Sequence, residues 1–175
     1  MRSLPSMVNA LVTTIAVVCV LVIGVTALTN GDLLWFAPSF TARAEAMTIY
    51  WDGNKYELYP GDQEYEGVMT AFAQGIEKPA GFEWEVAFSE ENITRYREDF
   101  RLLEVTFSEP VQVHTRHPFL KASTYLIPLD KTHANWRRVF AFPGLKPYTS
   151  GPLNMSPANF ELLVSTVEKA IAVHQ

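Results

Sequence analysis

Cysteine is almost absent from this sequence: one residue, Cys19, occurs among 175, and it lies inside an apolar stretch. No intramolecular disulfide can form, so a folded domain depends on its hydrophobic core or on a partner for stability. A Gly-rich phosphate-binding loop and a Gly-x-Ser-x-Gly nucleophile motif are also missing. Their absence removes the usual sequence signatures of nucleotide binding and serine hydrolysis.

Charged side chains are absent from Met7 to Leu28, a stretch of 22 residues rich in Val, Leu and Ile. At about 1.5 Å per residue, a helix of this length spans about 33 Å, which matches a hydrocarbon core of about 30 Å. The stretch predicts a transmembrane helix over residues 7–28. A cleavable signal peptide is the alternative, since Val25-Thr26-Ala27 offers a cleavage site, although the apolar run exceeds the roughly 7–15 residues of a usual signal.

Positive charge sets the expected orientation of this segment. Arg2 precedes it, and Asp32 is the first charged residue after it. Because positive charge is retained on the cytoplasmic side, we expect residues 1–6 to be cytoplasmic and the C-terminal part of the chain to be extracytoplasmic. Cleavage near Ala27 would instead release that part as a secreted protein.

Residues 29–46 are predicted to form an interfacial segment and linker between the membrane and the domain. Aromatic rings favour the boundary between water and lipid, so we expect three side chains of this segment to lie at headgroup depth: Trp35, Phe36 and Phe40. The alternative is a short hydrophobic lead-in to the folded domain.

Acidic residues dominate the first half of the remaining chain, and basic residues dominate the second. Residues 45–109 carry 15 acidic and 5 basic side chains, whereas residues 110–175 carry 3 and 7. Opposite charges favour packing of the two halves within one fold, and the alternative is a basic surface for an anionic partner. Nucleic acid does not suit a chain with a net charge of -5.

Turn residues and apolar spacing predict the secondary structure of residues 47–175. Asp52-Gly53 between two aromatic runs predicts a hairpin. Three helices are expected: one capped by Asp62 that runs to about Ile76, one from Ser89 to about Asp99, and one that begins at Ser156-Pro157.

Alternation of apolar and polar residues predicts further strands over 103–107, 111–114, 123–129 and 138–142. Together these elements predict an α+β domain over residues 47–175. Its antiparallel sheet is expected to have about five or six strands, with helices packed on one face.

Three stretches of this domain resemble bacterial single-pass, membrane-anchored extracytoplasmic proteins without an assigned function: Tyr59-Pro60-Gly61-Asp62-Gln63-Glu64-Tyr65, Phe107-Ser108-Glu109-Pro110-Val111 and Tyr125-Leu126-Ile127-Pro128-Leu129. The resemblance covers most of residues 45–175. It implies a membrane-anchored extracytoplasmic domain, and it implies neither an activity nor catalytic residues.

Histidine supplies the candidates for a metal site. His114-x-x-His117 and the nearby His133 offer three imidazoles, which are common ligands of transition metals. No acidic or thiol ligand accompanies them in a recognised spacing, and the glutamate of a zinc protease is missing. We therefore expect neither a metal nor a cofactor. The alternative is a ligand-binding or hydrolytic domain whose site combines these histidines from distant parts of the sequence.

Basic and aromatic residues in the second half are the main candidates for partner binding: Trp136, Arg137, Arg138, Arg116 and Lys121. Tryptophan and arginine often anchor protein interfaces, and they also suit lipid headgroups. A solvated loop cluster is the alternative. The sequence thus predicts a membrane-anchored, non-catalytic accessory or interaction protein of the cell envelope. Its expected partners are the bilayer, another membrane or envelope protein, and anionic lipid headgroups.

Overall fold

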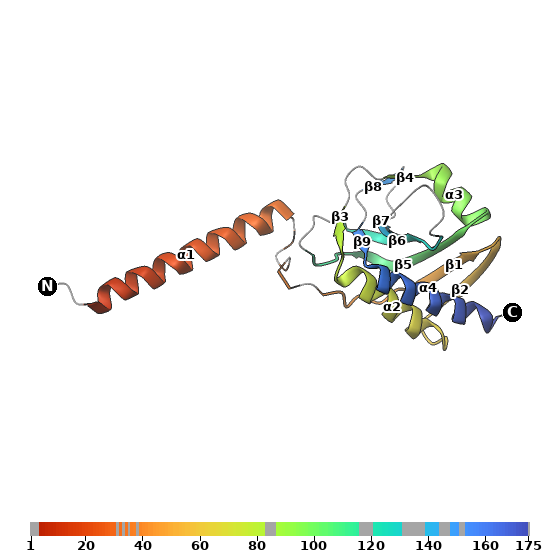
Figure 1. The fold of residues 1–175 in the computed structure, drawn as a ribbon, viewed down its shortest axis with the longest axis horizontal. Helices are drawn as coiled ribbons and strands as arrows, with labels where there is room; N and C mark the ends of the chain where they lie inside the picture. The colour runs from red at the N-terminus through yellow and green to blue at the C-terminus, as the bar shows by residue number, and fades with distance from the viewer. Residues whose placement is uncertain are drawn as a thin grey trace.

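A computed structural model describes residues 4–30, 32, 34, 36–37, 39–82, 87–115, 121–130, 139–143, 148–150 and 153–174. The chain begins with a long helix, α1 (Leu4–Asn30), which extends away from the rest of the molecule as a single rod (Figure 1). The predicted membrane segment, residues 7–28, lies within this helix. A folded domain follows it.

The described part of the domain contains a seven-stranded sheet made of β1 (Ala46–Trp51), β2 (Asn54–Leu58), β3 (Gly81–Phe82), β5 (Arg101–Val111), β6 (Ala122–Pro128), β7 (Val139–Pro143) and β9 (Leu153–Met155). The strand order is β2-β1-β5-β6-β7-β9-β3, and neighbouring strands are antiparallel. A separate pair is formed by β4 (Ala87–Ser89) and β8 (Tyr148–Ser150). The predicted α+β class with an antiparallel sheet is confirmed, with seven strands in place of five or six.

Two helices, α2 (Tyr65–Glu77) and α4 (Pro157–Ala172), cover one face of the sheet (Figure 1). Their apolar side chains bury the main hydrophobic core against β1, β5 and β6, and Phe72 and Phe160 are fully buried in it. The helices approach closely at Gly67, where a Cβ atom would lie 3.4 Å from the methyl group of Thr166. Gly67 lies in the first turn of α2, and a Cβ atom there would make an ordinary van der Waals contact with α4.

A third helix of the domain, α3 (Glu90–Glu98), lies on the opposite face of the sheet (Figure 1). Its Ile93 and Tyr96 belong to a second, smaller core with Phe88 and with Leu102 of β5. This arrangement differs from the prediction of helices on one face. The physical reason is that β5 is apolar on both faces, since Leu103 points into the main core and its neighbour Leu102 into the second.

The predicted hairpin is confirmed by the pairing of β1 with β2. Trp51 pairs with Asn54, which leaves a two-residue turn. Both turn residues have positive φ, 51° at Asp52 and 81° at Gly53. This left-handed conformation suits an Asp-Gly turn because it matches the twist of the flanking strands and because glycine has no Cβ.

Two of the three predicted helix caps are confirmed. The hydroxyl oxygens of Ser89 and Ser156 accept hydrogen bonds from the backbone three residues later, each at 3.2 Å. The prediction for Asp62 is wrong, because α2 begins three residues later and without a side-chain cap. Asp62 instead accepts the backbone N–H of Tyr59 at 2.6 Å, which closes the preceding turn.

Candidate functional site

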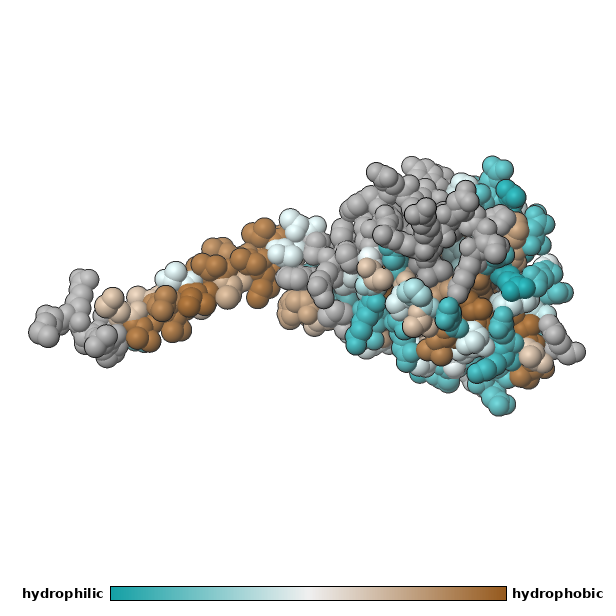
Figure 2. All heavy atoms as spheres, viewed as in Figure 1, coloured by the Kyte–Doolittle hydropathy of each residue, from teal (hydrophilic) through white to brown (hydrophobic). Residues whose placement is uncertain are grey.

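The surface of α1 is apolar and exposed. Leu28 is 85% exposed, and Met7 and Val20 are each 69% exposed. The span Met7–Thr29 is long and apolar enough to cross a membrane, and Figure 2 shows it as a hydrophobic rod that stands clear of the domain. A core helix of a globular domain would bury these side chains. The helix therefore needs lipid or another apolar partner around it.

Residues 39–46 pack along the domain. The ring of Phe40 lies edge-on to Phe72 and to Phe107, with centroid distances of 5.7 and 5.8 Å. Further along, the backbone N–H of Glu45 donates to a carbonyl of β5 at 2.7 Å. Phe40 thus belongs to the domain core rather than to the headgroup layer, which corresponds to the predicted alternative of a hydrophobic lead-in.

A largely buried contact between a carboxylate and an imidazole joins the segment after α1 to the domain, and we call it the Asp32–His114 clamp. Oδ1 of Asp32 lies 2.8 Å from Nδ1 of His114, which is 82 residues further along the chain. The same oxygen accepts the backbone N–H of Leu34 at 2.8 Å. His114 also forms an isolated β-bridge with Ser39. The side chain of Asp32 is 5% exposed and that of His114 is 27% exposed, so the pair is largely shielded from water.

The clamp fixes the imidazole of His114 in one orientation. When Nδ1 donates to the carboxylate, Nε2 is left as the acceptor, which is the arrangement of a catalytic histidine when a nucleophile faces Nε2. Among the described residues, the side-chain hydrogen bond of His114 is the one to Asp32. Oδ2 of Asp32 is buried without a hydrogen-bond partner. The contact connects two segments of the chain that are far apart in sequence, and the carboxylate depends on His114 and Leu34 for compensation.

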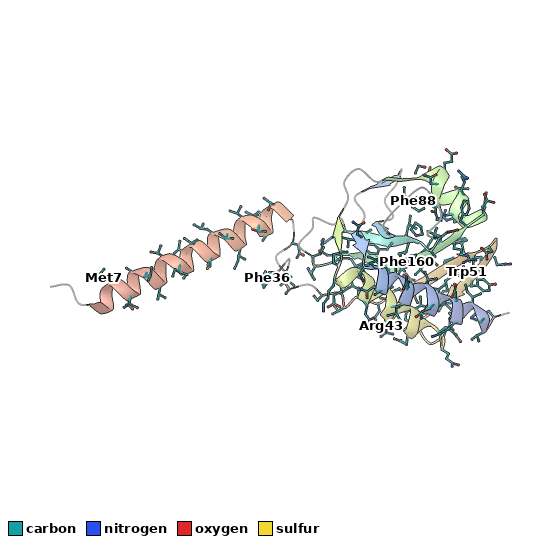
Figure 3. All side chains as sticks on the ribbon, viewed as in Figure 1. Met7, Phe36, Arg43, Trp51, Phe88 and Phe160 are labelled. Atoms are coloured by element: carbon teal, nitrogen blue, oxygen red, sulfur yellow. The ribbon has the colours of Figure 1, made fainter. Side chains whose placement is uncertain are left out.

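The opposite end of the sheet carries an exposed ion pair between Asp52 and Arg101. We call these two residues and Trp51 the distal cluster. The guanidinium of Arg101 donates to both carboxylate oxygens of Asp52, at 3.0 and 2.9 Å, and lies 4.1 Å above the ring of Trp51. The hydrogen bond to Asp52 raises the pKa of Arg101 above its usual value. Figure 3 shows Phe36 between α1 and the domain and Trp51 at the far end.

A groove of about 290 Å³ lies beside the distal cluster, between α4 and the ends of β5 and β6. It has an apolar floor, an acidic rim and one guanidinium, and it is lined by Arg101, Leu129, Asp130, Phe160, Glu161, Val164, Ser165 and Glu168.

The three predicted metal ligands are placed only in part. His114 is in the clamp, and His117 and His133 lie outside the described residues. Within the part of the chain that the structure describes, no group of three or more His, Cys, Asp or Glu residues is placed to hold a metal ion.

The predicted partner-binding residues fall mostly outside the described ranges, namely Trp136, Arg137, Arg138 and Arg116. Lys121 is described, and it is exposed immediately before β6, at the end of the sheet nearest α1. Of the interfacial aromatic residues, Trp35 also lies outside, while Phe36 is 56% exposed at the junction between α1 and the domain.

The sequence alone did not identify the clamp or the pair of Asp52 with Arg101. Asp32 was recognisable as the first charge after the apolar segment, but no spacing relates it to His114. Asp52 was recognisable as a turn residue, and its turn does place it near the strand that pairs with β1. Arg101 lies directly opposite Trp51 in that strand, so a register assignment would have brought the distal cluster together.

Comparison with known proteins yields one similarity of fold. No protein-family model matches the sequence, and no curated protein matches it. The crystal structure of YycH from Bacillus subtilis is similar over 74% of this chain, with 11% sequence identity and a TM-score of 0.49. The chain spans 38% of the length of YycH. A similarity at this level assigns the chain to no family and gives it no function.

Proposed function

We propose that this chain is a single-pass, membrane-anchored accessory protein of the cell envelope, whose extracytoplasmic domain is a non-catalytic interaction module. The observation that carries the proposal is the exposure of α1. Its apolar side chains cover a helix long enough to cross a bilayer, and they do not pack on the domain. Insertion into lipid is the arrangement that removes this surface from water.

The orientation rests on the distribution of charge around the anchor. Arg2 precedes α1, and the first basic residue after the helix is Arg43. Retention of positive charge on the cytoplasmic side supports an extracytoplasmic domain. An accessory role is supported by the interface-type residues at the distal cluster, where Trp51 and Arg101 lie together at the end of the sheet furthest from α1.

Membrane retention tests the first half of the proposal. Membranes that contain the full chain are extracted at alkaline pH, and the mass of the mature N-terminus is measured. Retention in the pellet together with an intact α1 is the expected result. A mature chain that begins after Ala27 and appears in the soluble fraction would contradict the anchor and support the secreted alternative.

Gentle solubilisation tests the accessory role. The solubilised complex is sized at native abundance, and we expect a mass that exceeds one chain because a second membrane or envelope protein is bound. A lone monomer would count against an interaction module. In the same assay, Arg137→Glu combined with Arg138→Glu is expected to weaken binding of the partner or of anionic lipid, most visibly at low salt, where charge contacts are strongest.

A further inference from the structure

The backbone places the start of the domain at the depth of the last turn of the membrane helix. The amide nitrogen of Asp32 donates to the carbonyl of Ala27 at 3.2 Å, and Ala27 lies inside the apolar span Met7–Thr29. Ala27 is 5% exposed, so the junction covers it. Asp32 follows Thr29 by three residues, a distance of at most about 10 Å in an extended chain. Asp32 must therefore lie close to the end of the hydrocarbon layer.

The Asp32–His114 clamp brings one end of the sheet to the same depth. His114 follows β5 by three residues, and the last residue of β5, Val111, pairs with Ala122 at the start of β6. The headgroup region on each side of a bilayer is about 5–8 Å thick. The clamp is made of direct contacts of 2.8 Å. This end of the sheet therefore cannot move out of the headgroup layer unless those contacts break.

The segment between anchor and sheet has little freedom. A flexible linker of about 16 residues would have a root-mean-square span of roughly 20–24 Å. Here the segment is instead attached at several points: Ser39 bridges His114, Phe40 enters the main core, and Glu45 bonds to β5. The orientation of the domain relative to α1 is therefore set by contacts rather than by chain length.

Among the described residues, the exposed charges at this end of the sheet include both signs. Glu109 of β5 and Lys121, the residue before β6, are both exposed there, and their charges are opposite. Phe36, an exposed ring at the junction, adds an amphipathic contact of the kind that suits the boundary between lipid and water. This chemistry fits a zwitterionic headgroup layer.

We propose that the end of the domain bearing His114, Lys121 and Phe36 rests on the lipid headgroup layer, and that the Asp32–His114 clamp holds it there with the distal cluster facing outward. The inference rests on the proposed function, because it requires α1 to remain in the bilayer. Along β1 alone, Trp51 lies about 17 Å further from this end than Ala46. The surface offered to a partner protein is therefore the distal one.

Depth-dependent quenching tests the proposal in the full chain. The protein is placed in phosphatidylcholine nanodiscs in a Cys19→Ala background, with a fluorophore attached through Lys121→Cys or through Asn54→Cys. Both positions are exposed, and Asn54 lies in the hairpin at the distal end. With a nitroxide on the lipid headgroup, we expect quenching at position 121 to be several-fold stronger than at position 54. Equal quenching at the two positions would overturn the proposal.

Variants then separate the clamp from the anchor. Asp32→Ala is expected to reduce the difference between positions 121 and 54, because the domain then moves on a free segment. Asp52→Ala, which removes a carboxylate from the distal pair, is the matched control and should leave the difference unchanged. If Asp32→Ala also leaves it unchanged, the clamp does not hold the domain. A chain that is not recovered with the nanodisc contradicts the proposed function itself, and circular dichroism verifies that each variant is folded.

Discussion

Two acid–base pairs stand at opposite ends of the same sheet, and they differ in what they connect. Asp52 and Arg101 link a turn to a strand that is already held by its register, since Trp51 and Arg101 are directly paired. Asp32 and His114 link the segment after α1 to the residues that follow β5, where the ladder contributes a single isolated bridge.

Burial sharpens the contrast between the pairs. The side chain of Asp52 is 57% exposed, whereas that of Asp32 is 5% exposed. An exposed pair competes with water at both partners and contributes little, while a buried carboxylate that loses its partner remains as an uncompensated charge. The distal pair has the better hydrogen-bond geometry, because Arg101 bonds both carboxylate oxygens of Asp52. We nevertheless expect loss of the Asp32–His114 clamp to cost more free energy.

The largest effects are expected at the clamp, where the first variant is Asp32→Ala. It leaves Nδ1 of His114 and the N–H of Leu34 without their acceptor, which costs about 1–3 kcal/mol of the free energy that holds the junction closed. This corresponds to cleavage of residues 32–37 by proteinase K that is about 5- to 150-fold faster.

His114→Ala should act through the same contact as Asp32→Ala, so the double variant should be far less than additive. His174→Ala is the matched control, because His174 contacts Tyr56 at the C-terminal end of the domain. Additive effects of the two clamp variants would show that the residues act independently.

A smaller effect is expected for Gly53→Ala. This variant tests whether the backbone conformation of the turn, rather than the ion pair, stabilises the hairpin at the distal end. Gly53 has a φ of 81°, and an alanine there costs about 1 kcal/mol of domain stability. Thermal unfolding of the domain measures this loss. Gln63→Ala, at an exposed position outside the hairpin, should leave the midpoint unchanged.

The distal ion pair should contribute less than the turn. Asp52→Asn keeps a residue that tolerates positive φ while it removes the charge, and we expect a loss of about 0.2–1 kcal/mol in the free energy of unfolding. Arg101→Ala should cost about 0.5–1 kcal/mol more, because the guanidinium also leaves the face of Trp51. Denaturant titration distinguishes the two, and a larger loss for Asp52→Asn than for Arg101→Ala would reverse this ranking.

The smallest effect is expected from salt. At 1 M ionic strength the Debye length is about 3 Å, so exposed charges are screened while buried contacts are largely unaffected. Double-mutant cycles at low and high salt should therefore show a reduced coupling for Asp52 and Arg101 and an unchanged coupling for Asp32 and His114. If both couplings fall equally, the clamp is open to solvent.

Periodicity and turn chemistry were sufficient to predict the main elements. The hairpin at Asp52-Gly53, the helix that begins after Ser156 and the strand over Leu103 to Phe107 each carry a local signal, and each is present. The short strands β3, β4, β8 and β9 were not predicted, because two or three residues are too few to show alternation. The face covered by α3 depends on β5 being apolar on both sides, which is a tertiary property.

The candidate site was harder to predict than the fold. A charge that directly follows an apolar segment is normally read as a marker of the membrane boundary, and its burial depends on a partner 82 residues away. Likewise, residues 39–46 have the composition of a linker, but Phe40 packs against the rings of Phe72 and Phe107 in the core. Long-range packing overrides the local composition in both cases.

One outer strand of the sheet, β2, bears on whether neighbouring copies of the chain can associate through their sheet edges. In the proposed anchored arrangement all copies share one orientation, so each presents β2, an edge strand of the described sheet, to its neighbours at high local concentration. Lys55 and Glu57 are exposed on β2, and they pair with each other within the strand. Charged side chains on a five-residue edge strand discourage the addition of a second strand to it.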